Sequence, residues 1–371
     1  MSQRSNALAW LSLLVALGCT RPAEERARRD LEVGHQRSSA FDVEVGSGLA
    51  ALRALSRDQL ALWLSAPSAD VSLVVRETLS LDLRVENAMA ALELVDLDSG
   101  RVIPLTGGAG ATKKTWRLAL IPGSWHFRLA APGVAEKGRF RFALMSDVQE
   151  AIDRIQDVYQ MIDAQPDLDF LLGAGDLTEE GEVDELQRFQ HELATLDVPY
   201  YTTLGNHELA ERPPAYQDWF GRANFQFVHR GVYFTLLDSA SATIDPLVGD
   251  WLDDWLANGK KSVHVVAMHI PPLDPVGTRN AAFASRAEAA TLLAKLAEAG
   301  VDLTLYGHIH SYYSFQNAGI PAFISGGGGA NPERADDIGR HFMVFDVDAT
   351  RGVLSHEVVR VDHGDEIDED E

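Results

Sequence analysis

The chain has 371 residues, of which 46% are hydrophobic, so it is long enough for two domains and apolar enough to bury a core. Its 55 acidic and 32 basic residues give a formal net charge of −23. This excess argues against a nucleic-acid partner, because a phosphate backbone would be repelled. A small phosphorylated substrate stays compatible with it, since bound cations reverse the field locally.

The first 40 residues have the pattern of an export signal followed by a tether. Arg4 lies in a short polar start, and the apolar stretch 7–18 is too short to cross a bilayer but suits the core of a signal peptide. The only cysteine, Cys19, comes next, so no disulfide can form within this chain. We predict a signal peptide over 1–18 and a flexible tether over 19–40, which is polar and has no sustained apolar period after Cys19.

Residues 41–138 show the alternation of short β-strands. Val71, Leu73 and Val75 alternate with small or polar residues, and turn pairs such as Pro122-Gly123 separate the runs. Short strands at this spacing predict a small all-β sandwich domain, and no catalytic constellation is found in it.

From residue 139 the pattern changes to alternating strands and helices, which indicates an α/β layer fold. Apolar strands are predicted at 140–145, 168–172, 263–268 and 301–306, with helical spacing in several of the segments between them. The acidic run that starts at Asp365 is interpreted as a solvated tail. We therefore assign 139–371 to one α/β domain with an acidic C-terminal tail.

Side chains of metal-ligating types follow these strands directly, where α/β sheets gather their functional groups. They are, in chain order, Asp147, Gln149, Asp176, Asn206, His269, His308 and His310. Taken singly, Asp147 and Asn206 are readily explained as turn or capping residues. As a set, carboxylate, amide and imidazole donors without a thiolate predict a pair of Mn, Fe or Zn ions with a bridging carboxylate.

The order of the motifs resembles that of the calcineurin-like metallophosphoesterase superfamily. The motifs are Asp147-x-Gln149, Gly175-Asp176, Gly205-Asn206-His207-Glu208, His269 and Gly307-His308-x-His310. The resemblance implies a four-layer sandwich, in which two mixed sheets are flanked by helices, after the all-β domain. It also implies that Asp147, Gln149, Asp176 and His310 hold one metal ion, while Asp176, Asn206, His269 and His308 hold the other.

This resemblance further implies hydrolysis of a phosphate monoester or diester, with a hydroxide that bridges the metals as the nucleophile. His207 would act on the phosphate, and Glu208 would orient its imidazole. Gln149 departs from the histidine of most members, and its amide oxygen favours Mn at that position. The alternative is a membrane-anchored binding protein that uses the metal fold as a scaffold.

The run Val15-Ala16-Leu17-Gly18-Cys19 resembles the lipobox of bacterial lipoproteins, although Ala16 stands where leucine is commonest. The alternative is an ordinary cleaved signal with a coincidental cysteine. We expect an exported lipoprotein on the periplasmic or cell-surface side of a membrane. Its expected partners are a small phosphorylated substrate and the membrane, the latter through the lipid anchor only.

We predict that Cys19 carries lipid. Metabolic labelling with a fatty-acid analogue should mark the natural sequence and leave Cys19→Ser unmarked, because no other thiol is present. An unlabelled wild-type protein recovered soluble from the periplasm would rule out the anchor.

Overall fold

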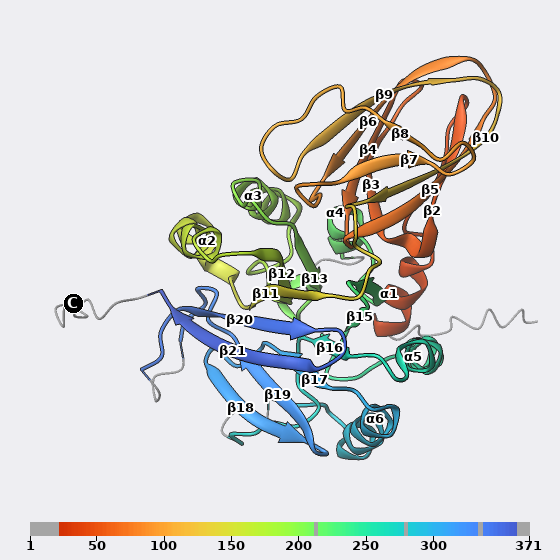
Figure 1. The fold of residues 1–371 in the computed structure, drawn as a ribbon. Helices are drawn as coiled ribbons and strands as arrows, with labels where there is room; N and C mark the ends of the chain where they lie inside the picture. The colour runs from red at the N-terminus through yellow and green to blue at the C-terminus, as the bar shows by residue number, and fades with distance from the viewer. Residues whose placement is uncertain (1–21, 211–213, 278–280, 333–336, 362–371) are drawn as a thin grey trace, which may run out of the picture.

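The computed structural model describes residues 22–210, 214–277, 281–332 and 337–361 (Figure 1). The expected signal peptide, Cys19 and the acidic tail lie outside these residues. Within the described segments, no helix has both the length and the apolar character needed to cross a membrane.

The N-terminal strands form a sandwich of two sheets, as the alternating pattern predicts (Figure 1). One sheet has the order β1 (His35–Arg37), β2 (Phe41–Val45), β5 (Ser68–Val75), β10 (Gly123–Ala130), β7 (Glu93–Asp96) and β8 (Arg101–Ile103). The other has the order β3 (Ala50–Leu55), β4 (Gln59–Leu64), β6 (Leu79–Glu86) and β9 (Lys114–Leu120), with the short turn η1 (Gly46–Gly48) ahead of it. Alternate side chains such as Leu73 and Leu81 are buried between the sheets around Trp116, while their neighbours face outward.

Two mixed sheets form the centre of the following α/β domain. The first has the order β13 (Tyr200–Thr203), β12 (Leu168–Ala174), β11 (Arg139–Met145), β20 (His341–Asp348) and β21 (Gly352–Arg360). The second has the order β14 (Phe225–His229), β15 (Val232–Leu237), β16 (His264–Met268), β17 (Leu303–Tyr306), β19 (Ile320–Ser325) and β18 (Tyr312–Asn317). β11, β12 and β13 are parallel to one another, as are β15, β16, β17 and β19.

The helices cover the outer faces of the two sheets, which confirms the predicted four-layer fold class. η2 (Gln149–Arg154), α2 (Gln156–Asp163) and α3 (Val183–Leu193) pack on the first sheet, and α5 (Pro246–Gly259) and α6 (Arg286–Ala299) on the second. Alternation along β11 places Phe142 in the core between the sheets and Ala143 in the core beneath the helices. Central strands are thus buried on both faces, which explains their nearly continuous apolar sequence.

For residues 22–40 the structure differs from the expected flexible tether. α1 (Pro22–Asp30) packs against the α/β domain and buries Arg26 and Asp30, which are 2% and 0% exposed. Arg26 pairs with Asp238, which is far along the chain. Polar composition is a poor guide here, because it does not show that each buried charge has a partner in the tertiary structure.

Buried contacts also join the sandwich to the α/β domain. α4 (Tyr216–Phe220) lies against β3 and β4, and the rings of Trp63 and Phe220 meet edge-on with centroids 5.7 Å apart. The Asn87 amide nitrogen donates to the Leu64 and Tyr200 carbonyl oxygens, and its Oδ1 accepts from Tyr200 N at 2.7 Å. The two domains are therefore held in one arrangement.

His264, the first residue of β16, is a buried imidazole with a pH-dependent role. It is 2% exposed, and its Nε2 lies 2.8 Å from Thr235 Oγ1. Burial lowers the pKa of His264 to about 4. Because this pKa lies below the unfolded value of about 6.5, the neutral imidazole stabilises the fold above pH 6.5, and that contribution is lost as the pH falls toward 4.

We predict that the unfolding free energy of the wild type falls between pH 7 and pH 4 by on the order of 3 kcal/mol more than that of His264→Gln. Glutamine keeps a polar group near Thr235 but has no proton to gain. Urea unfolding of both proteins at both pH values measures the difference, and parallel pH dependence would contradict the assignment.

Candidate metal centre

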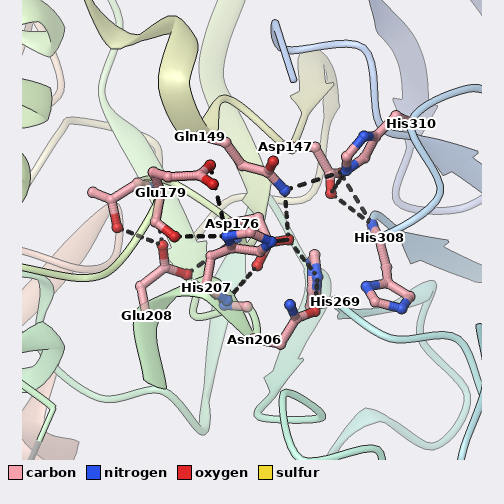
Figure 2. Close-up of polar contacts among 12 residues, drawn as sticks. Asp147, Gln149, Asp176, Glu179, Asn206, His207, Glu208, His269, His308 and His310 are labelled. Atoms are coloured by element: carbon pink, nitrogen blue, oxygen red, sulfur yellow. Dashed lines mark hydrogen bonds and ion pairs between the residues drawn. The ribbon is translucent and has the colours of Figure 1, made fainter. Parts of the chain in front are cut away.

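The strands of both sheets deliver polar side chains to one place (Figure 2). Asp147 follows β11, Asp176 follows β12 and Asn206 follows β13, all from the first sheet. His269 follows β16, and His308 and His310 follow β17, from the second sheet. The structure thus brings together the side chains that the sequence predicts as ligands, although they are spread over more than 160 positions of the chain.

Two groups of ligand atoms converge and share one carboxylate. The first contains Asp147, Asp176 and His310, and the second contains Asp176, His269 and His308. Within each group these atoms lie within 4.8 Å of one another. Asp176 is shared by the two groups, as in the two sets that the resemblance implies, and Asn206 Oδ1 and Gln149 Nε2 lie 3.1 Å and 3.2 Å from His269 Nε2 and His310 Nε2.

The hydrogen bonds of His269 show that its ring nitrogen is oriented to accept a cation. Its Nδ1 lies 2.8 Å from the Ala174 carbonyl oxygen, which can only accept, so Nδ1 carries the proton. Nε2 then presents a lone pair, yet it lies 3.1 Å from Asp176 Oδ2 and 3.1 Å from Asn206 Oδ1. Electron-rich atoms repel one another at such distances, so this arrangement is favourable only when a proton or a metal ion lies between them.

The electric field at the centre favours positive charge. Burial lowers the pKa of His269, but the Asp176 and Asp147 carboxylates outweigh it and raise the pKa to about 9. Burial acts to raise the pKa of Asp176, but its contacts with His269 lower it overall. The same attraction acts on a divalent cation, so the donor types and the field both fit a metal pair.

Gln149 stands at the first group with its amide nitrogen, not its oxygen, toward the centre. Its Nε2 donates to Asp176 Oδ2 at 3.1 Å and lies 3.2 Å from His310 Nε2. His310 Nδ1 donates to the Asn331 carbonyl oxygen at 2.7 Å, which leaves His310 Nε2 facing inward. For Gln149 to bind a metal ion in this group, its amide would have to turn over and present its oxygen.

Left-handed backbone conformations aim several of these side chains. Asp147, Gln149, Asp176 and His308 have φ values of 62°, 49°, 51° and 71°. Each such conformation costs a non-glycine residue roughly 1–2 kcal/mol, so the surrounding contacts must hold it. Gly175 has φ 92°, and a Cβ there would lie 2.7 Å from Gly205 N and 2.9 Å from His269 Cβ. Only glycine at position 175 allows the loop that carries Asp176 to approach Gly205 and His269 so closely.

Glu208 holds together the loops that carry Asp176 and Asn206. The resemblance had implied that Glu208 orients His207, and the structure shows that it does not. Its buried carboxylate accepts from the main-chain nitrogens of Gly205, Asp176, Leu177 and Thr178 at 2.7–3.1 Å. The turn η3 (His207–Leu209) directs consecutive side chains differently, so Glu208 points into the protein and His207 toward the centre. Burial raises the pKa of Glu208 to about 7, and Asp176 acts in the same direction.

A main-chain carbonyl orients the His207 imidazole instead. Nδ1 lies 2.6 Å from the Glu179 carbonyl oxygen and therefore carries a proton. This leaves Nε2 toward the metal groups, 3.9 Å from Asp176 Oδ2, on a side chain that is 30% exposed. Burial lowers the pKa of His207, but Asp176 and the Glu179 carbonyl raise it by more. Sequence reasoning missed Glu179, since its place after Asp176 does not reveal where its carbonyl points.

A comparison with known families accounts for this arrangement. Residues 140–312 match the family described as calcineurin-like phosphoesterase. This segment belongs to that family. The match contains all of the predicted ligands and His207, and the calcineurin-like segment ends at the start of β18.

Similar proteins include a 3',5'-cyclic-nucleotide phosphodiesterase of Nostoc sp., 29% identical over 174 residues that cover 42% of this chain. The chain spans 61% of the length of that relative. Among solved structures, GAP50, the anchor in the inner membrane complex of Plasmodium, has a TM-score of 0.48 at 17% identity, over 62% of this chain and 87% of its own. A dimetal phosphatase from Danio rerio has a TM-score of 0.46 at 14% identity, over 60% of this chain and 99% of its own.

Gln149 gives a direct test of the first metal group of the calcineurin-like segment. We predict that Gln149→His tightens metal retention and moves the preference from Mn toward Zn or Fe, because imidazole suits those ions better than an amide oxygen does. Metal content after dialysis against each ion measures the change. Unchanged retention and unchanged preference would show that Gln149 does not contact a metal.

Proposed function

We propose that this protein hydrolyses phosphate esters with two metal ions bound at the shared Asp176 carboxylate. The observation that carries this proposal is the convergence of two donor groups on Asp176. When the His269 imidazole is neutral, its proton is on Nδ1, so the inward-facing Nε2 can bind a cation. Asp147, Gln149 and His310 would complete one site, and Asn206, His269 and His308 the other. The donors suit Mn, Fe or Zn.

A metal pair bound there would neutralise charge on the phosphoryl oxygens and lower the pKa of a water molecule between the ions. The protein supplies the rest by position. Asp176 is held by the main-chain N–H of His207 at 3.0 Å, and Glu208 fixes the loop that carries it. The bridging carboxylate therefore needs little rearrangement before binding.

His207 is the group best placed to act on the substrate. Its Nδ1 proton is engaged by the Glu179 carbonyl, so Nε2 is the atom that faces the metal groups and the partly open side of the site. When protonated, Nε2 would donate a hydrogen bond to a phosphoryl oxygen or a proton to the leaving oxygen.

The charge around His207 favours diesters over monoesters. Glu179 Oε2 lies 3.7 Å from His207 Nδ1, and Glu150 lies close enough to influence Glu179. A phosphate monoester carries close to two negative charges at neutral pH, whereas a diester carries one. The Nostoc relative is named as a cyclic-nucleotide phosphodiesterase, so we propose small phosphodiesters, including 3',5'-cyclic nucleotides, as the substrate class.

Export and membrane anchoring through a lipidated Cys19 form part of the same proposal. They are supported by the signal-like stretch 7–18 and by the lipobox resemblance of Val15-Ala16-Leu17-Gly18-Cys19. The lipid on Cys19 would then be the only contact with the membrane.

We predict that Asp176→Asn abolishes Mn-dependent turnover, because both metal groups lose their shared carboxylate.

His207→Ala should lower turnover roughly 100-fold or more and keep its metal content, as expected for a group that acts on the transition state. Asp253→Asn, at an exposed position paired with Lys295, is the matched control and should behave as wild type. Turnover of bis(p-nitrophenyl) phosphate, 3',5'-cyclic AMP and p-nitrophenyl phosphate, with metal content measured in parallel, checks each outcome.

Near wild-type turnover by Asp176→Asn would overturn the two-metal proposal, and loss of metal by His207→Ala would make that residue a ligand. A wild-type protein that binds Mn but turns over none of the three esters would favour the alternative, a binding protein that uses the metal fold as a scaffold.

A further inference from the structure

The inner face of α1 buries charged side chains, although apolar side chains could also pack the helix against the α/β domain. Arg26 is 2% exposed and Asp30 is 0% exposed, and both lie between α1 and the α/β domain. Burial of a charge is costly unless it is fully paired, and an apolar replacement is often at least as stable. Attachment of the helix alone therefore does not explain these two residues.

Arg26 closes a turn that follows β15. Its Nε donates to Asp238 Oδ2 at 2.6 Å, and its Nη2 donates to Asp238 Oδ1 at 3.1 Å and to Ser241 Oγ at 3.0 Å. Asp238 Oδ1 also accepts from Ala240 N at 3.1 Å. The planar guanidinium thus holds both ends of the turn 238–241 in one geometry.

This turn reaches the metal centre through one hydroxyl group. Ser239, which is 0% exposed, accepts from Ile270 N at 2.7 Å through its Oγ. Ile270 directly follows His269, whose Nε2 faces Asp176 and Asn206. The position of the 238–241 turn therefore sets the backbone beside a predicted metal ligand.

Asp30 supports the neighbouring ligand loop through a second path. Its carboxylate accepts from Ala223 N at 3.0 Å, Asn224 N at 2.9 Å and Asn224 Nδ2 at 2.9 Å. Asn224 Oδ1 accepts from Asp238 N at 2.8 Å, which links this path to the first. Thr203, near the start of the loop that carries Asn206, donates to the Ala223 carbonyl oxygen at 2.8 Å.

We propose that Arg26 and Asp30 are positioning residues for the metal centre, so that α1 is a built-in brace for the His269 and Asn206 loops. The proposal rests on the proposed metal centre, but the brace itself is a property of the hydrogen-bond network. Neither residue contacts the predicted ligands, and both act through the segments 223–224 and 238–241.

The test compares three variants of the full chain. Arg26→Lys keeps the charge but loses the planar fork, and Ser239→Ala removes the hydroxyl that holds Ile270. Arg28→Ala changes an exposed arginine of the same helix whose partner within the described segments is Glu24, so it is the matched control. The first readout is amide hydrogen exchange of the metal-free proteins, followed in peptides that cover 237–241 and 269–271.

We expect exchange at 269–271 to rise roughly tenfold in Arg26→Lys and Ser239→Ala, while exchange in β10 of the sandwich stays as in the wild type. Mn affinity should fall roughly 10- to 100-fold in both variants, as for other groups that orient metal ligands. The fall in kcat should exceed any rise in KM, and Arg28→Ala should match the wild type in every readout.

Wild-type exchange at 269–271 in both variants would overturn the brace. An equal rise across the whole chain, β10 included, would also overturn it and leave α1 with a purely structural role. If the wild type binds no Mn, the proposed function fails, whereas the exchange comparison still decides the fate of the brace. If Arg26→Lys does not fold, Ser239→Ala decides alone, because it alters a single hydroxyl at the end of the path.

Discussion

The arrangement of this protein depends on one buried carboxylate, that of Asp176. It is 1% exposed and is faced by the imidazoles of His269 and His207, by the Gln149 amide and by the main-chain N–H of His207. A charge in such a place is unfavourable unless its partners are held in position before it ionises. Much of the surrounding structure serves this purpose, from the Glu208 carboxylate under the loop to the glycines that let the loops approach.

The parts of the site that depend on local chain order could be predicted from the sequence. Side chains of metal-ligating types placed just after apolar strands are brought together by the parallel order of those strands, so the positions of Asp147, Asp176 and His269 predicted that they would lie close together. The alternation of strands and helices predicted an α/β layer fold, whereas the four-layer sandwich was expected only from the resemblance to the calcineurin-like superfamily.

The parts that depend on direction or on distant partners could not be predicted. Glu208 adjoins His207 in the sequence, yet the η3 turn sends the two side chains to different places, and a carbonyl of Glu179 takes the role expected of Glu208. The segment that contains Arg26 has the composition of a tether, because the sequence alone does not show Asp238 as its partner. Likewise, the amide orientation of Gln149 is set by Asp176 and His310, which are distant in the chain.

The contact between Asn87 and Tyr200 lets the sandwich cover part of an edge strand of the α/β domain. β13 is an edge strand of its sheet, and an edge strand offers unpaired main-chain groups to any strand that meets it. Asn87 satisfies both the N–H and the carbonyl of Tyr200 with one amide, as a neighbouring strand would. The sandwich thus shields the start of an edge that would otherwise be free to associate with other chains.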